Sequence, residues 1–332
     1  MIERVRGFVT SKPAMLSISL LFTLSAIWLA VRNIDAGQIL SALDRMPAWP
    51  YVVSFCFLIA GTLVRGLRFH ILMRRNRSTF LASLEMIVIG YLFTTLLPLR
   101  TGELVRIGYF SRRTQIPALT TTTAIMAERA MDLIALAFLA AIFLSGLAGR
   151  HFSQLPAPPW ALGLAAGIGA AGALAFGLLA RRRLLNKRSD TEGRSTRWFD
   201  EALRGLTALG SVRDAVLAMG LSVALWIMVS ISIRFAFQSV ELDIPISDAA
   251  VIMLGTCFAI ALPSTPGFVG TYHLGFVAGA LLVGIPREIS LPVAFVFHLV
   301  IQVPFLPIGG LILFTGGRKA LAKPPGTQST SR

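Results

Sequence analysis

The stretch Gly90-Tyr91-Leu92-Phe93-Thr94-Thr95-Leu96-Leu97-Pro98-Leu99-Arg100-Thr101-Gly102-Glu103-Leu104-Val105-Arg106 decides the fold. It begins as apolar sequence, breaks at Pro98 and then carries Arg100, Glu103 and Arg106. A helix that crosses a bilayer needs about 20 apolar residues, and the apolar run from 87 to 99 is shorter. Irregular backbone at membrane depth is tolerated only where protein buries it or water reaches it. The stretch therefore predicts the turn of a re-entrant hairpin, with a site at that turn.

The pattern returns in the second half, in the stretch Gly255-Thr256-Cys257-Phe258-Ala259-Ile260-Ala261-Leu262-Pro263-Ser264-Thr265-Pro266-Gly267. Its Gly, Phe, Leu, Pro and Gly stand in the register of the first copy, from Gly90 to Gly102. An apolar run precedes each copy, at 51–73 and 215–237, and another follows, at 119–147 and 289–314. Paired interrupted segments in two halves of a chain point to a transporter binding site.

Composition indicates a polytopic membrane protein. The chain has 332 residues, of which 55% are hydrophobic and 14% charged, whereas soluble domains carry about 25% charged residues. The net charge of +15 does not predict nucleic-acid binding, because the basic residues cluster beside apolar runs, as in cytoplasmic loops. Cys56 and Cys257 lie inside apolar runs and suggest neither a disulfide framework nor a metal cluster. We expect no cofactor.

The predicted fold is an all-α polytopic membrane protein with about six full transmembrane helices and two re-entrant hairpins in an inverted repeat. Matched helices of the two halves are separated by an odd number of crossings, so the halves have opposite orientation. Positive flanks place both termini in the cytoplasm. We expect one membrane domain over 1–332, with a first helix at 13–31, a first repeat at 51–147 containing a hairpin at 84–113, a connecting helix at 161–180, a basic cytoplasmic loop at 181–213, and a second repeat at 215–314 containing a hairpin at 249–284.

Charged residues inside the apolar runs are the next candidates. Glu128 and Asp132 are four apart and share a helical face, and Arg129 points about 100° away from Glu128. Such groups cost about 2.5–3.5 kcal/mol each in the hydrocarbon, so they pair or face a cavity. Arg65 and Arg68 lie three apart on one face. Two alternatives stay open: snorkelling of these arginines to the interface, and an ion-pair cluster that only locks the hairpin.

The hairpin turns favour an anion. The second arm of each hairpin begins just after the break, so its free N–H groups and helix dipole point toward mid-membrane. Arg100 and Arg106 strengthen this preference. The candidate substrate-binding residues are Arg65, Arg68, Arg100, Gly102, Glu103, Arg106, Glu128, Arg129, Asp132, Pro263, Pro266, Gly267, Gly270 and His273.

Three motifs carry a family resemblance: the run from Leu97 to Arg106, the run Glu128-Arg129-Ala130-Met131-Asp132, and the run from Leu262 to Gly270. In this order they resemble the lysylphosphatidylglycerol synthase transmembrane-region family of flippase-like membrane proteins. The resemblance implies a protein that moves or presents lipids across a bacterial inner membrane. Family members often place Glu shortly after the second Pro-Gly motif, where this chain has Thr271, Tyr272 and His273. No aminoacyl-transferase domain fits in this chain, so lipid aminoacylation is not expected.

The sequence therefore predicts lipid translocation of a flippase-like kind. An anionic or polyprenyl-phosphate-linked lipid would place its head group between the hairpin tips, with the tails in the lipid bilayer. No P-loop motif is present, so a gradient or downstream metabolism would drive it. One alternative is a non-transporting membrane partner of a lipid-biosynthesis enzyme. A less favoured alternative is an intramembrane lipid-modifying enzyme, because His273 and His298 lie far in sequence from Glu128. We expect a non-enzyme of the cell inner membrane.

Overall fold

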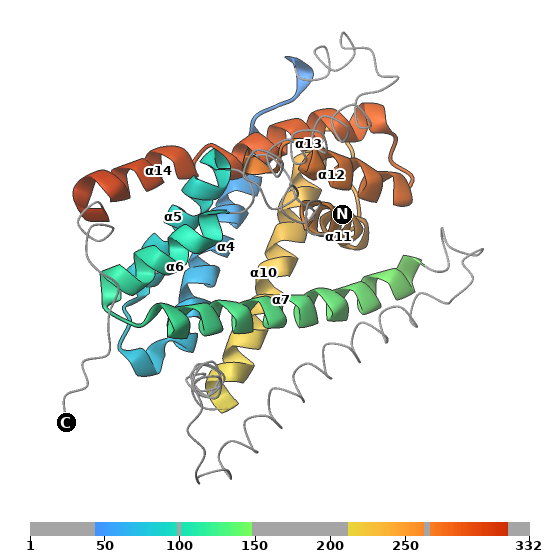
Figure 1. Ribbon diagram of the computed structural model, residues 1–332. Helices are drawn as coiled ribbons and strands as arrows, with labels where there is room; N and C mark the ends of the chain where they lie inside the picture. Colours follow the sequence, from blue (N-terminus) through green and yellow to red (C-terminus); the bar gives the residue numbers. More distant parts are fainter. Residues whose placement is uncertain (1–43, 98–100, 148–211, 262–265, 318–332) are drawn as a thin grey trace, which may run out of the picture. The chain divides into compact units, whose positions relative to one another are not determined.

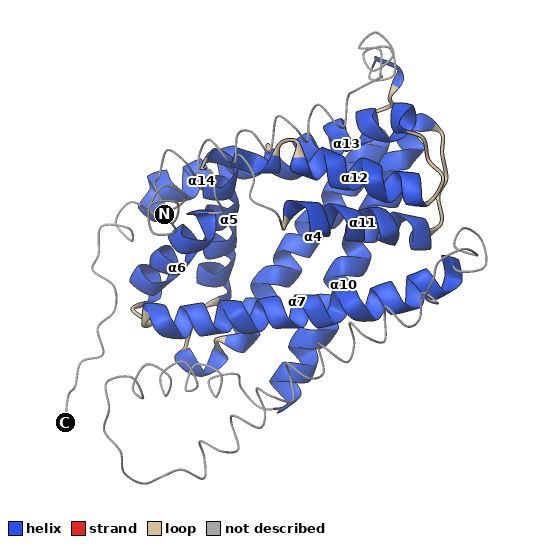
Figure 2. Ribbon diagram, turned by 45° about the vertical axis from the view of Figure 1, so that its right-hand side comes forward, coloured by secondary structure: helices blue, strands red, loops and turns tan. Residues whose placement is uncertain are grey.

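The computed structural model describes residues 44–97, 101–147, 212–261 and 266–317, and these form helices joined by turns (Figures 1 and 2). The predicted helices at 13–31 and 161–180, nearly all of the basic loop and both termini lie outside the described residues. Three helical segments, Trp49–Leu72, Arg213–Val240 and Arg287–Thr315, are long and apolar enough to cross a membrane. The prediction of a polytopic all-α membrane protein is thus confirmed.

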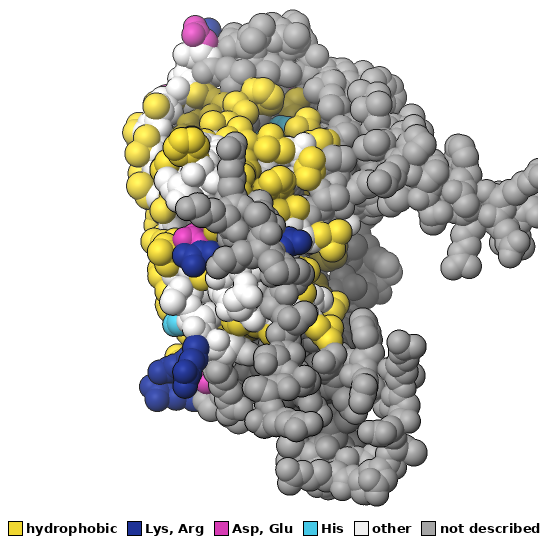
Figure 3. Space-filling model, turned by 60° about the vertical axis from the view of Figure 1, so that its left-hand side comes forward, with side chains coloured by type: hydrophobic (Ala, Val, Ile, Leu, Met, Phe, Trp, Pro, Cys, Tyr) yellow, Lys and Arg dark blue, Asp and Glu magenta, His cyan; other side chains and the backbone are white. Residues whose placement is uncertain are grey.

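The surface agrees with this assignment. On the face drawn in Figure 3, most described side chains are hydrophobic, and the charged ones gather in a few small groups. Large apolar residues such as Leu104, Phe258 and Phe314 are 71%, 77% and 79% exposed. Exposed apolar area of this extent marks a surface that is covered by something other than water, and a bilayer is the covering that the long apolar helices predict.

The chain divides into two compact units. The first unit combines Met1–Leu58, Gly90–Leu104 and Val229–Ile308, and the second combines Ile59–Ile89, Val105–Met228 and Gly309–Arg332. Each unit therefore draws on both predicted repeats. The long helices α4 (Trp49–Leu72) and α10 (Val212–Phe237) contribute one end to each unit.

In the second unit, α4 and α10 pack with α7 (Ala118–Leu147). Leu72, Met131 and Ala218, one from each helix, form a buried apolar cluster. The ring of Phe69 meets that of Phe110 edge to face at 5.1 Å. After α4, the short 3-10 helix η1 (Arg74–Asn76) ends at a left-handed residue and turns the chain toward α5.

The first predicted hairpin is formed by α5 (Phe80–Leu96) and α6 (Thr101–Thr114). Helix α5 ends at Leu96 and α6 begins at Thr101, and each helix is too short for a full crossing. At the broken end, a Cβ on Gly102 would stand 2.5 Å from the carbonyl oxygen of Gly90. At the other end, the Tyr109 hydroxyl donates to Glu85 Oε2 at 2.8 Å. The two helices are therefore antiparallel, and their insertion into the membrane stays a prediction.

The second predicted hairpin, in the first unit, is formed by α11 (Ile246–Ile260) and α12 (Thr271–Leu282), with the 3-10 helix η3 (Pro266–Phe268) between them. Pro266 begins η3 in the register in which Thr101 begins α6. The helices are in close contact, since a Cβ on Gly255 would stand 2.8 Å from the carbonyl oxygen of Gly275. Gly267 has φ 65° and Gly270 has φ 89°, values at which a side chain is strained.

The remaining helices of the first unit follow α12. They are α13 (Arg287–Gln302) and the start of α14 (Phe305–Ile312), which the π-helix η4 (Leu313–Gly317) extends. The short 3-10 helix η2 (Gln238–Val240) continues α10, and the Ser239 hydroxyl donates to the Tyr51 hydroxyl of α4 at 2.9 Å. Of these helices, α13 supplies His298 and Gln302 to the second break.

Candidate functional site

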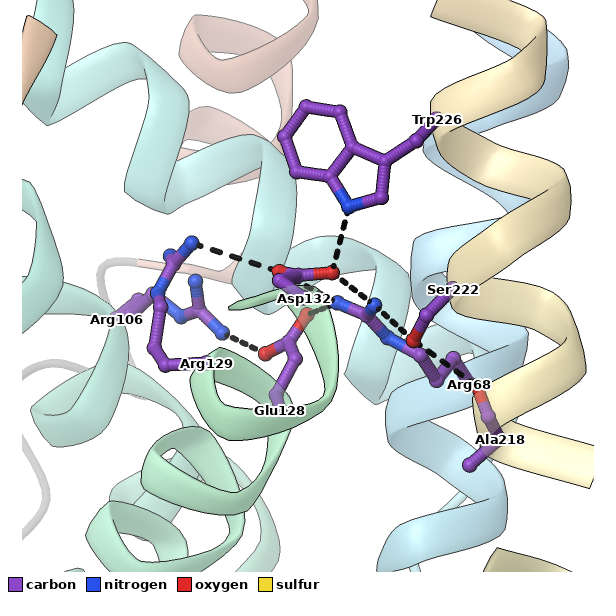
Figure 4. A network of polar contacts seen from close by, with 8 residues as sticks. All are labelled: Arg68, Arg106, Glu128, Arg129, Asp132, Ala218, Ser222 and Trp226. Atoms are coloured by element: carbon purple, nitrogen blue, oxygen red, sulfur yellow. Dashed lines mark hydrogen bonds and ion pairs between the residues drawn. The ribbon is translucent and has the colours of Figure 1, made fainter. Parts of the chain in front are cut away.

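The centre of the second unit is a buried arginine on α4. Arg68 is fully buried and donates through Nη2 to Glu128 Oε1 at 2.5 Å, and through Nη1 to Asp132 Oδ1. Both carboxylates come from α7 and are themselves 1% and 4% exposed. The predicted spacing of four places them side by side on one face, so a single guanidinium reaches both (Figure 4). The snorkelling alternative is therefore wrong for Arg68.

Two further arginines approach the same carboxylates from the other side (Figure 4). Arg106 of α6 donates through Nη2 to Glu128 Oε2 at 2.6 Å. Arg129 of α7 lies 3.8 Å from Asp132 Oδ2, and its side chain is 47% exposed. The Arg106 side chain is 8% exposed. The first hairpin is thus joined to α7 through Glu128.

Helix α10 completes the cluster with two neutral side chains. Arg68 Nη1 donates to Ser222 Oγ at 2.7 Å, and that hydroxyl donates to the carbonyl oxygen of Ala218 at 3.0 Å. Trp226 Nε1 donates to Asp132 Oδ1 at 3.2 Å. The guanidinium of Arg65 lies over the Trp226 ring, 5.4 Å from its centroid, a cation–π geometry. Arg65 is thus held at the edge of the cluster.

Arginines outnumber carboxylates in the contacts described above. Three guanidinium groups, those of Arg68, Arg106 and Arg129, contact two carboxylates. Arg68 is enclosed and serves both carboxylates, whereas Arg129 is at the surface. Charges in an apolar setting are stable only when they are compensated, and the arginines compensate both buried carboxylates. We use the name arginine cluster for the group formed by Arg68, Arg106, Glu128, Arg129, Asp132, Ser222 and Trp226.

A second polar group surrounds the break in the first unit. The carbonyl oxygen of Gly267 accepts from His298 Nε2 at 2.8 Å and from Gln302 Nε2 at 3.1 Å. Gln302 Oε1 in turn accepts from the Thr95 hydroxyl at 2.8 Å. Thr95 is one residue before the last residue of α5. The end of the first interrupted helix therefore lies beside the turn of the second, and Gln302 of α13 bridges them.

His273 lies in the first turn of α12, among aromatic rings. Its Nδ1 accepts from the backbone N–H of Gly270 at 3.4 Å. Its ring meets that of His298 edge to face at 5.0 Å, and the ring of Tyr272 stacks on His298 at 4.3 Å. His273 Nε2 is buried and has no hydrogen-bond partner among the described residues.

The remaining candidate site residues belong to the two predicted hairpins. Arg100 and Pro263 lie outside the described residues. Gly102 is buried and Glu103 is half-buried in the first turn of α6, where a carboxylate suits the helix dipole. Pro266 begins η3, and Gly270 precedes α12. The structure adds residues that were not selected from the sequence: Thr95, Ser222, Trp226, His298 and Gln302.

A signal for some of the added residues is present in the sequence. Ser222 and Trp226 are four apart and share a face of an otherwise apolar helix, as do His298 and Gln302. A polar pair at this spacing in a membrane helix indicates a buried polar contact. Thr95 has no such signal, because it stands in a run of ordinary apolar and hydroxyl residues.

Comparison with known families decides the assignment. The family model described as the lysylphosphatidylglycerol synthase TM region matches residues 16–309. The chain belongs to this family. The match includes both interrupted segments and the arginine cluster, so the resemblance seen in the three motifs is confirmed. It also confirms that the protein is a membrane protein.

One curated relative of this family member is the protein named Glycosyltransferase AglD from Haloferax volcanii. It is 26% identical over 339 aligned residues, which include 89% of this chain and 53% of the relative. The chain thus spans about half the length of that relative.

Proposed function

We propose that this protein translocates an anionic or polyprenyl-phosphate-linked lipid across the cell inner membrane. The observation that carries the proposal is the bridge from Thr95 through Gln302 to Gly267. It holds the ends of two interrupted helices together in a protein with long apolar helices. In transporters, such interrupted helices meet at the substrate site. Backbone that is released from helical bonding there can bind a polar head group while the lipid tails stay in the bilayer.

The arginine cluster supports a negatively charged head group. Guanidinium groups are well matched to phosphate because they offer paired N–H donors in one plane. Arg106 and the half-exposed Arg129 are the arginines that we assign to a lipid phosphate held at the arginine cluster, which is a site of the second unit. Arg68, which is enclosed by Glu128, Asp132 and Ser222, is assigned a positioning role. The proposal assigns no catalytic residue.

The direct test is reconstitution of the purified chain in vesicles. A dye-labelled phosphatidylglycerol is placed in both leaflets, and quenching from outside then reports the lipid that crosses. We expect the protein to accelerate crossing relative to protein-free vesicles. Thr95→Val, which removes the bridge to Gln302, should slow crossing. The matched control is Thr122→Val, because the Thr122 hydroxyl donates to Ala118 within its own helix. Equal rates with and without the wild-type protein would refute translocation by this chain alone.

A second candidate function is suggested by the relative. AglD is named a glycosyltransferase, and about half of it aligns with this chain. A region of this kind could present a lipid to a transferase and not move it. In that case the purified chain would bind an anionic lipid but leave its crossing rate unchanged, and a lipid-modifying enzyme would be recovered with it from membranes.

A further inference from the structure

Hydrogen bonds indicate which ring nitrogen carries a proton in each of the two histidines at the second break. His298 Nε2 donates to the Gly267 carbonyl oxygen, so this nitrogen carries the proton. His273 Nδ1 accepts from the Gly270 N–H, so the His273 proton is on Nε2. The two rings are 5.0 Å apart, and we call them the imidazole pair.

The proton on His273 Nε2 has no acceptor in the described part of the chain. The residue is buried, with 8% of its surface exposed. A buried donor without a partner costs about 1–3 kcal/mol, and such a group in a native protein calls for an explanation. It stands in the first turn of α12, where backbone N–H groups have no partner within the helix. The site therefore offers at least one donor, His273 Nε2, to an acceptor that the described residues do not provide.

The surroundings of the imidazole pair contain few other titratable groups. Tyr272 of α12 stacks on His298, Cys257 of α11 interacts electrostatically with Tyr272, and Phe295 and Gln302 come from α13. Among the residues the structure describes, no carboxylate or guanidinium bonds to either imidazole. A proton that enters here changes the local charge from zero to one.

One extra proton on the imidazole pair would change its hydrogen bonding and its charge. On His273 it must go to Nδ1, which then can no longer accept from the Gly270 N–H. Two imidazolium ions 5.0 Å apart would repel each other strongly, so the pair takes a single proton. A cation at the N-terminus of a helix is disfavoured by the dipole. An anion bound beside His273 removes this penalty, and it also gives His273 Nε2 an acceptor.

We propose that the imidazole pair binds one proton together with the anionic head group, so that lipid movement is coupled to a proton gradient. This inference rests on the proposed function and adds its energy source. A proton from the aqueous phase is taken up as the phosphate binds, and it is released when the phosphate leaves on the other side. Linkage between two ligands is reciprocal. If a bound proton raises the affinity for the head group by some factor, a bound head group raises the affinity for the proton by the same factor.

The test measures protons taken up per lipid bound. Short-chain phosphatidylglycerol is titrated calorimetrically into detergent-solubilised protein, in two buffers that differ in protonation enthalpy. Its phosphodiester keeps one negative charge across about pH 5 to 8, the range in which imidazoles titrate. Any proton uptake therefore belongs to the protein. We expect net uptake of up to one proton per lipid, absent in His273→Gln and His298→Gln. Tyr272→Phe is the matched control and should retain uptake, because it keeps the ring stacked on His298.

The outcomes separate the two proposals. Lipid binding without proton uptake by the wild-type protein overturns the coupling, and this result does not depend on any variant folding. Unchanged uptake in the His273→Gln/His298→Gln double variant also overturns it. Proton-linked binding without lipid crossing in vesicles would retain the imidazole pair as a proton and anion site and refute translocation. Absence of any lipid binding would refute both.

Discussion

Arg68 shows how this chain holds charge inside an apolar protein. Its guanidinium is fully buried, yet it contacts Glu128, Asp132 and the Ser222 hydroxyl. A buried charge that loses its partner is strongly destabilising, although the intact pair adds little compared with apolar packing. Arg65, one turn earlier, lies at the edge of the cluster and contacts the Trp226 ring. These neighbouring arginines should therefore respond very differently to the same substitution.

We predict that Arg68→Met lowers the free energy of unfolding in detergent by about 3–5 kcal/mol, because Glu128 and Asp132 lose their shared cation. Arg65→Met is the matched control on the same helix, and it should cost about 0.5–1 kcal/mol, the value of a cation–π contact at a partly exposed site. Denaturant titration monitored by tryptophan fluorescence measures both. Similar losses in the two variants would show that the carboxylates are not held by Arg68.

The sequence allowed part of this arrangement to be predicted. The spacing of Glu128 and Asp132 places both on one face, and the cost of buried charge requires cations nearby. The choice among the arginines could not be predicted, since it depends on how α4, α6 and α7 pack together. Arg68, for which snorkelling was an open alternative, is the enclosed residue. Arg100 lies outside the described residues, so its part stays a prediction.

At the scale of elements, glycines allow the two arms of each interrupted helix pair to pack closely. Gly102 packs on the backbone of Gly90 and Thr94 within the first hairpin, and Gly255 packs on Gly275 in the second. The repeat in the sequence predicted an interruption in each half, but not the residue at which each second arm begins, which is Thr101 in α6 and Thr271 in α12. It did not predict that the two matched glycines act differently. Gly102 permits close helix contact, whereas Gly267 has a positive φ that L side chains rarely adopt.

We predict that Gly102→Ala destabilises the protein and slows lipid crossing, because the added methyl would stand 2.5 Å from the Gly90 carbonyl oxygen and 2.7 Å from Thr94 N. Gly108→Ala, on the same helix, is the control. There the new methyl would meet only the flexible end of Arg112, at 3.1 Å, and alanine favours the helix by up to about 1 kcal/mol. Thermal melting and the vesicle assay report both variants. If Gly102→Ala melts at the wild-type temperature, the hairpin is not closely packed at its broken end.

At the scale of the whole molecule, the proposed lipid translocation depends on which loops face which side of the membrane. The predicted inverted repeat, together with the distribution of positive charge, would place the loop at Arg74 in the cytoplasm and the loop at Glu288 outside. This orientation lets the two hairpins enter from opposite sides. The long apolar helices and the family assignment are established, whereas the orientation is a property of the protein in its membrane and follows from charge alone.

We predict that cysteines introduced at Arg74 and Glu288, in a background lacking Cys56 and Cys257, react with an impermeant thiol reagent from opposite sides. The side chain of Arg74 is 73% exposed, and Glu288 lies in the first turn of α13, at the end of that helix. Intact cells should label only the cysteine at 288, and permeabilised cells should label both. Labelling of both positions in intact cells would rule out the inverted arrangement.

The measurement that most directly tests the central claim is lipid crossing by the Arg106→Gln/Glu128→Gln double variant, with an anionic and an uncharged lipid compared in the same vesicles. The double substitution removes one positive and one negative charge, and the glutamine that replaces Glu128 can still accept from Arg68. We therefore expect a wild-type level of folded protein. Because Arg106 is proposed to bind the lipid phosphate, crossing of the anionic lipid should fall to the rate of the uncharged one. Full retention of anionic lipid crossing would contradict the account and remove Arg106 from the binding site.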